Sequence, residues 1–249
     1  MTDSSVSAPT TERSTSVPDE EFTRPFDAFP ELFDRFTLIW DGISSSFDDW
    51  ILDHLPPHAL RGLDLGCGAG RHSVLLADRA DRVLAVDVAN RMLDIARADR
   101  PRPNIDYRQG GVLDVTPAEG PFDVVLSVHT LHHVGDPATV LPHVRSLLAP
   151  GGQLIVADII DPGGWGTREF HVNRAFNDAA LVYELTGDGA AAADVVRLLL
   201  HPRWRDLTEA DIPLTRAAFH RAYERAFPGV VFADDLHPIM AGAVWRAPS

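Results

Sequence analysis

Residues 63–72 read Leu63-Asp64-Leu65-Gly66-Cys67-Gly68-Ala69-Gly70-Arg71-His72, an apolar run that passes directly into alternating glycines. The apolar run is typical of a buried strand, and the residues after Gly70 are typical of a helix. Glycines at such a junction let the backbone bend sharply and let a ligand lie against the main chain. The stretch therefore predicts a strand, a ligand-binding loop and a helix in succession.

Short apolar runs and helical stretches alternate around this loop. The expected strands lie at 60–65, 82–86, 104–108, 122–128 and 153–157, and the helices between them at 70–79, 90–98 and 137–148. Gly151-Gly152 is expected to form a turn before the last of these strands. A helix at 214–226 and two strands at 229–236 and 241–247 follow later in the chain. The alternation predicts an α/β fold, a doubly wound and mostly parallel sheet with helices on both faces.

Three segments stand outside this alternation. Residues 1–18 are rich in Ser and Thr with few apolar side chains, which predicts a disordered tail. Residues 19–57 are expected to form an N-terminal helical lid, with Pro30 in the first turn of one helix and a further short helix at 48–55. The lid carries aromatic residues spaced alternately four and three apart: Phe22, Phe26, Phe29, Phe33, Phe36 and Trp40. Residues 161–211 are expected to be a helical cap inserted before the sixth strand of a domain that spans 58–249.

Two carboxylates flank the glycine loop. Asp64 precedes the first glycine, and Asp87 ends the second strand 21 residues after Gly66, where a carboxylate commonly accepts hydrogen bonds from ribose hydroxyls. The Gly-x-Gly-x-Gly spacing is followed by Arg71, so it differs from the Gly-x-Gly-x-x-Gly pattern of dinucleotide sites. Asp64 also suits a positively charged ligand better than a pyrophosphate. These features indicate a nucleoside with a cationic group, such as S-adenosylmethionine, more than NAD.

At these residues the chain resembles the class I S-adenosylmethionine-dependent methyltransferases, within the group that acts on small molecules (methyltransferase-domain types 11 and 25). The resemblance rests on four segments: Leu63–Gly70, Val86–Val88, Phe122–Val125 with Leu131–His133, and Leu147–Gly152. It covers residues 48–158 closely and the last two strands loosely, and it is silent on the substrate. It implies a Rossmann-like seven-stranded sheet with an antiparallel last strand, and S-adenosylmethionine as the cofactor.

The resemblance also implies which residues would hold the cofactor: Asp64, Gly66, Cys67, Gly68, Gly70, Asp87, Val88, Met92, Gly111, Val112 and Ser127. The three glycines would face the methionine and ribose portions, and Asp87 would hold the ribose. Val88 and Met92 would lie against the adenine. Because Gly111 stands where the family often has an acidic residue, adenine recognition would rest on backbone groups or on Asp114.

Histidines and aromatic residues are the candidates for contact with a methyl acceptor. His129 is the expected catalytic base, since imidazole has a pKa near neutrality. The residues expected to bind the substrate are Phe33, Phe36, Trp40, His129 and His133. Core packing is the alternative role for the aromatic stripe, and Leu131-His132-His133 also resembles a family feature that packs imidazoles against the following helix. From the cap, the candidate contacts are Trp165, Phe170, His171 and Tyr183.

The spacing His129-x-x-His132-His133 raises the question of a metal site. No nearby cysteine or carboxylate is judged to complete a ligand set with it, so no metal is expected. Cys67 is expected to be a small buried residue rather than a nucleophile, and as the single cysteine it can form no internal disulfide.

Composition narrows the function further. All 22 basic residues are Arg, which excludes a P-loop Lys, a Schiff-base Lys and a catalytic Lys. A formal net charge of -14 without a basic patch argues against nucleic acid or an anionic membrane surface as partner. No apolar run is long enough to span a membrane and no signal-peptide core stands at the N-terminus, so we expect a soluble cytoplasmic protein, monomeric or homodimeric.

The favoured interpretation is a transferase that moves a methyl group to oxygen, nitrogen or carbon of a small, fairly apolar metabolite. Three alternatives stay open. One is an RNA or protein methyltransferase, and a second is a cyclase- or decarboxylase-like enzyme in which the bound nucleoside is structural. The third is a nicotinamide oxidoreductase, which the Arg71 mismatch disfavours. Formation of S-adenosylhomocysteine with a candidate acceptor distinguishes methyl transfer from the second and third.

Overall fold

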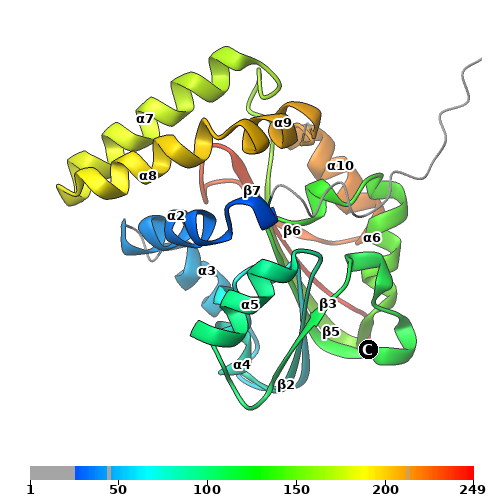
Figure 1. Cartoon of the computed structure of the whole chain (residues 1–249). Helices are drawn as coiled ribbons and strands as arrows, with labels where there is room; N and C mark the ends of the chain where they lie inside the picture. Colours follow the sequence, from blue (N-terminus) through cyan, green and yellow to red (C-terminus); the bar gives the residue numbers. More distant parts are fainter. Residues whose placement is uncertain (1–25, 44–45, 212) are drawn as a thin grey trace, which may run out of the picture.

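The centre of the protein is a seven-stranded sheet, seen in a computed structural model that describes residues 26–43, 46–211 and 213–249 (Figure 1). The tail expected at 1–18 lies outside these residues. The strands are β1 (Ala59–Leu65), β2 (Ala80–Asp87), β3 (Ile105–Gln109), β4 (Phe122–Val128), β5 (Leu148–Ile159), β6 (Val231–Ala233) and β7 (Met240–Arg246). They lie in the order β3-β2-β1-β4-β5-β7-β6.

The strand directions confirm the predicted fold class. β1 to β5 pair in parallel, whereas β7 runs antiparallel to both β5 and β6. The order reverses between β1 and β4, and in open parallel sheets a ligand binds beyond the carboxyl ends of the strands at such a point. That edge carries the glycine loop after β1 and the histidines after β4.

Two strand boundaries differ from the sequence predictions. The turn expected at Gly151-Gly152 is an irregularity inside β5, where the pairing register shifts between Phe122 and Val124 and Gly151 has φ 73°. β6 is shorter than the predicted 229–236, because Asp234 beyond its end pairs with side chains of the preceding helix. A short edge strand offers few unpaired backbone groups to another chain.

Helices cover both faces of the sheet, as expected. α6 (Pro137–Ser146) and α10 (Arg216–Ala226) pack on one face. α3 (Ser46–His54), α4 (Arg71–Ala77) and α5 (Asn90–Asp99) pack on the other. Side chains along β4 point alternately to the two faces of the sheet. Val125 packs in the core on the α6 and α10 side, and Val124 and Leu126 pack in the core on the other side. Three 3-10 turns, η1 (Val112–Asp114), η2 (Pro117–Glu119) and η3 (Leu131–His133), precede or follow β4.

The lid helix α2 (Pro30–Ile43) begins at Pro30, as predicted from the fixed backbone angle of proline. Residues 26–28 are also helical and are separated from α2 by a bend at Phe29, so the aromatic stripe does not lie on one unbroken helix. α2 packs against α5 of the sheet domain and against the cap.

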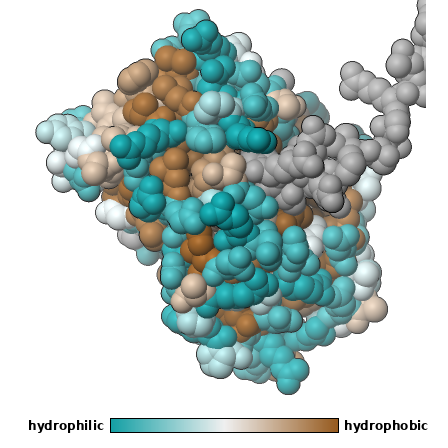
Figure 2. All heavy atoms as spheres, viewed as in Figure 1, coloured by the Kyte–Doolittle hydropathy of each residue, from teal (hydrophilic) through white to brown (hydrophobic). Residues whose placement is uncertain are grey.

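The cap consists of α7 (Arg168–Thr186), α8 (Gly189–Leu199) and α9 (Pro202–Ala210). α7 and α8 form a hairpin at the top of Figure 1, with α2 beneath α8. The cap leaves and re-enters the sheet domain at one place, because Asp161 N donates to Leu214 O at 2.9 Å and Asp161 forms a β-bridge with Thr215. Figure 2 shows apolar surface over this hairpin, where Phe176, Leu181 and Leu185 are exposed. None of the helices that the structure describes has the length and apolar character needed to cross a membrane.

Candidate functional site

The glycine loop joins β1 to α4 at the carboxyl edge of the sheet. Gly66, Gly68 and Gly70 adopt φ of 76°, 51° and 81°, a left-handed backbone that favours glycine. Side chains at the first and last of these positions would overlap Thr130 and Tyr107, respectively, whereas the Cβ side of Gly68 is nearly open. The three glycines are thus required by conformation, and the middle one leaves room against the main chain.

Asp87 ends β2 and anchors this loop. Its Oδ2 accepts a hydrogen bond from Gly68 N at 2.8 Å, and its Oδ1 accepts one from Ala89 N at 2.8 Å. Burial raises the pKa of its carboxyl. Each carboxylate oxygen has two lone pairs, so both oxygens retain capacity to accept bonds from ligand hydroxyls.

The residues expected near the adenine meet beside Asp87. Gly110 N donates to Asp87 O at 3.0 Å, and a Cβ added at Gly111 would lie 3.7 Å from Val88. Met92 and Val112 are buried. Asp114 accepts from Gly111 N at 2.8 Å, so in this structure its Oδ2 caps the local turn.

Three of the expected cofactor residues have buried side chains at or next to the loop: Asp64, Cys67 and Ser127. Asp64 is 1% exposed and accepts a 2.6 Å hydrogen bond from Ser73 Oγ, and burial raises the pKa of its carboxyl to about 7. Ser127 is also buried and donates to Leu65 O at 3.1 Å, tying β4 to β1. Cys67 is buried, and burial raises the pKa of its thiol well above its usual range, which fits the predicted filler role. These groups support the loop in this structure.

The lid residues expected to contact substrate lie among aromatic neighbours. Phe33 packs against Met92, Ala69 and Ala89 next to the loop, and its ring centroid lies 5.7 Å from that of Trp204 in the cap. Phe36 and Trp40 belong to the cluster formed with α7 and α8. Phe33 therefore borders the loop, and the other two join the lid to the cap.

Charged contacts of the lid were not found from the sequence. Arg71, at the start of α4, pairs with Asp41 of α2 and with Asp48 of α3 (2.7 Å to Asp48). Arg100 of α5 pairs with Asp34 of α2 at 2.9 Å. The partners are separated by tens of residues, so no local spacing reveals them.

His129 follows β4 and has φ 53°, unusual for a residue with a side chain. Its ring stacks on Phe47 at 5.9 Å, and Nε2 lies 3.4 Å from Met240 Sδ. Burial lowers the pKa of His129 to about 3. The imidazole is therefore neutral at physiological pH and is a weak base, and the catalytic role expected for it stays a prediction.

The next two histidines meet carboxylates from distant parts of the chain. His132 Nδ1 lies 2.5 Å from Asp158 Oδ1 at the end of β5, and His132 N donates to Asp158 Oδ2 at 2.9 Å. Burial alone would lower the pKa of His132, but the charge and hydrogen bond of Asp158 outweigh it and raise the pKa. His133 Nδ1 contacts Asp211, just after α9.

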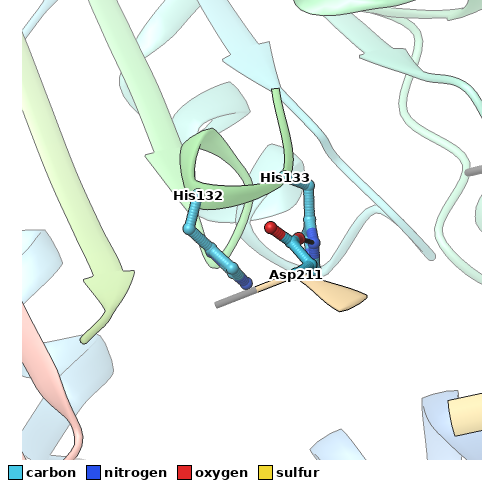
Figure 3. A group of neighbouring side chains, drawn as sticks. All are labelled: His132, His133 and Asp211. Carbon is cyan, nitrogen blue, oxygen red and sulfur yellow. Dashed lines mark hydrogen bonds and ion pairs between the residues drawn. The ribbon is translucent and has the colours of Figure 1, made fainter. Parts of the chain in front are cut away.

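This arrangement bears on the argument made from the sequence against a metal, and the absence of a metal stays a prediction. That argument rested on the lack of a nearby carboxylate, and the fold supplies two. Figure 3 shows His132, His133 and Asp211 converging from η3 and from the end of the cap. Asp158 could have been found from the sequence, because it stands at the carboxyl end of a predicted parallel strand. No feature of the sequence around Asp211 pointed to a role in the site.

A cavity of about 270 Å³ lies beside these side chains. Its lining comes from η3, α6, α10, the end of β5 and residues after α9. Most of the lining is apolar, and its polar side chains are His132, Asp158, Asp211 and Tyr223. Thr130 precedes Leu131 of the cavity lining, and its Oγ1 donates a 3.3 Å hydrogen bond to Gly66 O of the glycine loop.

The cap residues expected near the acceptor separate into two groups. Trp165 and His171 are buried with ring centroids 5.8 Å apart, and Phe170 lies beside both. The Arg174 guanidinium lies 5.7 Å from the Trp165 ring. Tyr183 is 58% exposed on α7, so the expectation that it lines a pocket was wrong. It lies on the outer face of the hairpin, which the helical period alone did not orient.

Comparison with known proteins agrees with this geometry. The fold is that of the class I S-adenosylmethionine-dependent methyltransferases, and a family described as "Methyltransferase domain" matches residues 63–156. This chain therefore carries a methyltransferase domain, from β1 to the middle of β5.

Curated relatives are similar over about half of this chain. A ubiquinone biosynthesis O-methyltransferase of Cereibacter sphaeroides is 36% identical over 127 residues, which are 50% of this chain and 51% of that protein. One from Azotobacter vinelandii is 37% identical over 115 residues, 45% of this chain and 49% of that protein. The chain thus spans about half the length of the curated relatives it matches.

Solved structures extend the likeness of fold to most of the chain. A methyltransferase in complex with the Trm112 activator of Haloferax volcanii superposes with a TM-score of 0.59 at 17% identity, covering 94% of this chain and 100% of that one. A complex described as DhpI-SAM-HEP gives 0.57 at 21% identity, covering 91% and 96%.

Proposed function

We propose that this protein is an S-adenosylmethionine-dependent methyltransferase that acts on a small, fairly apolar metabolite, with oxygen as the favoured acceptor atom. The main support is the position of the left-handed glycine loop, which is held by Asp87 and contacts Thr130. Thr130 is followed directly by Leu131, which lines the cavity after β4 and β5. One ligand site and one cavity thereby meet at the reversal point of the sheet. The choice of oxygen follows the names of the curated relatives.

The side chains around the loop fit a nucleoside with a cationic group. Asp87 has free lone pairs for ribose hydroxyls, and the buried Asp64 supports the loop through Ser73. Arg71, the cation nearest in sequence to the last glycine, is already paired with Asp41 and Asp48. A pyrophosphate at the loop would meet the carboxyl of Asp87, and Arg71 is engaged by its two aspartates.

Each cofactor residue then has a role. The backbone of Gly66, Gly68 and Gly70 lies along the methionine and ribose portions, and Asp87 holds the ribose. Three apolar side chains cover the adenine together with the backbone of Gly111: Val88 just after β2, Met92 of α5 and Val112 of η1. Asp64, Cys67 and Ser127 hold the loop in shape. When bound, S-adenosylmethionine supplies a methyl group already activated by its positive sulfur.

The acceptor occupies the cavity between η3, α6 and α10. The mostly apolar lining favours an apolar body, and the few polar groups at His132, Asp158, Asp211 and Tyr223 favour one polar end. Phe33, Trp165 and His171, three of the substrate contacts expected from the sequence, lie outside the lining of this cavity. The protein's main contribution is alignment of the acceptor atom with the methyl carbon, and such positioning supplies about 7–11 kcal/mol in favourable cases.

Calorimetric titration with S-adenosylmethionine and S-adenosylhomocysteine tests the cofactor assignment. The wild-type protein should bind both, and Asp87→Ala should bind both about 10–100-fold more weakly because it loses hydrogen bonds made by a charged group. Asp106→Ala is the matched control, since Asp106 is an exposed carboxylate on the adjacent strand. Unchanged affinity in Asp87→Ala, or binding of NADH in place of the nucleoside, contradicts the assignment.

Mass spectrometry of the ligand that co-purifies with the protein identifies the candidate acceptor. Incubation of that molecule with S-adenosylmethionine should then produce S-adenosylhomocysteine and a product heavier by one methyl group in place of hydrogen. Conversion of the acceptor without S-adenosylhomocysteine would favour the alternative in which the nucleoside is structural.

A further inference from the structure

The cluster of His132, His133 and Asp211 has the composition of a metal site. One ligand atom from each residue lies within 4.8 Å of the others, and all three side chains are partly buried (Figure 3). They come from two elements, η3 after β4 and the chain after α9, so the fold rather than a local motif brings them together.

His132 is held in the orientation that a metal ligand needs. Asp158 is only 3% exposed, and its oxygens accept from the ring Nδ1 and from the backbone N of His132. Because a carboxylate accepts, Nδ1 carries the proton and the lone pair is on Nε2. A carboxylate behind a histidine is the usual outer arrangement at metal sites, where it fixes the ring and increases its basicity as a ligand.

His133 is fixed next to it. The two imidazole rings lie 3.8 Å apart between centroids, and the His133 ring packs edge-on against Phe26 of the lid at 5.8 Å. Asp211 faces His133 with a carboxylate oxygen. Two imidazoles and one carboxylate thus face a common point from η3 and the end of the cap.

Independent support comes from a polar group in the adjoining cavity that has no partner. Tyr223 is 2% exposed and its hydroxyl makes no hydrogen bond, although it lines the same cavity as His132, Asp158 and Asp211. A buried hydroxyl without a partner is costly, which indicates that a polar ligand atom belongs in this space. Two separate histidine–aspartate pairs would not account for it.

We propose that His132, His133 and Asp211 bind one divalent transition-metal ion, with Zn²⁺ the best match, and leave at least one coordination position open to the cavity. Two imidazoles and one carboxylate are a ligand set used at zinc sites with an open position, and imidazole suits transition metals better than Mg²⁺ or Ca²⁺. Tyr223 and Asp158 border the open side.

The role of this ion rests on the proposed function. An acceptor hydroxyl bound at the open position loses its proton to solvent water more readily, because the cation stabilises the oxyanion. The oxygen then forms a bond to the methyl carbon as the bond from that carbon to sulfur breaks, and S-adenosylhomocysteine leaves. No oxidation or reduction takes place. This role removes the need for His129 to act as a base.

Metal content of the full chain tests the site directly. After treatment with a chelator and its removal, the protein should take up one Zn²⁺ per chain by calorimetry and elemental analysis. Co²⁺ in the same site should give visible absorption bands. His133→Gln and Asp211→Asn, which retain side-chain size, should each weaken Zn²⁺ binding at least about 10–100-fold, and Asp158→Asn should weaken it to a smaller degree.

His58→Ala is the matched control, because His58 pairs with Asp81 at 2.9 Å on an exposed surface and has no second imidazole beside it. It should leave Zn²⁺ affinity unchanged. Circular dichroism and S-adenosylmethionine affinity report whether each variant is folded. Substoichiometric Zn²⁺ in the wild type, or equal affinity in folded His133→Gln and Asp211→Asn, overturns the metal site. Stoichiometric Zn²⁺ without methyl transfer would leave the site standing and overturn its role and the proposed function.

Discussion

Asp158 joins the end of β5 to η3 by accepting hydrogen bonds from both the ring and the backbone of His132. The pair is almost wholly buried, with side chains 4% and 7% exposed. One aspartate therefore holds a turn from the neighbouring strand and sets the direction of an imidazole that borders the cavity.

Replacement of this aspartate should destabilise the protein strongly. In metal-free protein, Asp158→Ala leaves a buried imidazole and a backbone N–H without their partner, so the free energy of unfolding should fall by about 3–5 kcal/mol. Asp81→Ala, which breaks the exposed pair with His58, should cost less than about 1 kcal/mol. Urea unfolding monitored by circular dichroism measures both. Equal losses would mean that burial of the His132 pair has no energetic effect.

Stability should also depend on pH through Asp64. Burial raises the pKa of this carboxyl to about 7 in the folded protein, against 3.8 when unfolded. Between these values the folded state retains a proton that the unfolded state has lost, so stability falls as pH rises from about 4 to 7. Asn cannot lose this proton, so Asp64→Asn should gain stability relative to the wild type over that range, by a few kcal/mol on the order expected for three pKa units. Urea unfolding of both proteins from pH 5 to pH 8 measures the free energy of unfolding at each pH. If this free energy changes with pH in the same way in both proteins, the prediction is contradicted.

Gly66 should not tolerate a side chain. Gly66→Ala places a Cβ against Thr130 at a positive φ, and we expect a loss of more than about 1 kcal/mol in unfolding free energy together with weaker nucleoside binding. Gly42→Ala is a suitable control, because Gly42 lies in α2 with nothing within 4 Å of an added Cβ. That change should stabilise the protein by about 0.5–1 kcal/mol. Thermal unfolding ranks the two variants, and a neutral Gly66→Ala would show that the loop is not constrained as described.

The lid should depend on Arg71. Arg71→Met leaves the carboxylates of Asp41 and Asp48 without their shared cation, so amide hydrogen exchange should become faster across α2 and α3 while β4 is unaffected. Arg97→Met, which breaks an exposed pair with Asp94, should not change exchange in the lid. Unaltered exchange in α2 after the Arg71 change would mean that the aromatic contacts alone hold the lid.

His129 should be dispensable as a base. Its pKa of about 3 leaves it neutral, so His129→Gln should retain turnover to within about tenfold with the acceptor identified above. The dependence of kcat on pH should show no titration of His129 near pH 6–7. Turnover and cofactor affinity are measured on the same preparation. A loss of 100-fold or more with unchanged cofactor affinity would instead restore the predicted catalytic role.

The sheet could be predicted because its signals are local. Each buried strand is a short apolar run, and the glycines after Leu65 and the carboxylate at Asp87 stand next to strands in the sequence. The candidate site could be predicted only where it follows the same rule. His129, His132 and His133 directly follow β4 and were found, whereas Asp158 was not singled out and Asp211 could not be.

What the sequence could not supply is the pairing of residues brought together by the fold. Asp211 reaches His133 across 78 residues, from the end of the inserted cap. The same reason explains the error at Tyr183, where a helical residue was given a pocket role without a means of orienting α7. The degree of burial of these side chains could not be predicted from the sequence either. Burial is what makes His129 a weak base and Asp64 a weak acid.

The single junction at Asp161 and Leu214 has an evolutionary consequence. Because the inserted helices begin and end at adjacent points, their length and sequence can diverge between relatives without altering the order of the seven strands. Asp211 lies just inside that boundary, so one side chain of the cavity lining belongs to the inserted segment while the glycine loop and Asp87 belong to the sheet domain. New acceptors can therefore arise by replacement of one contiguous segment.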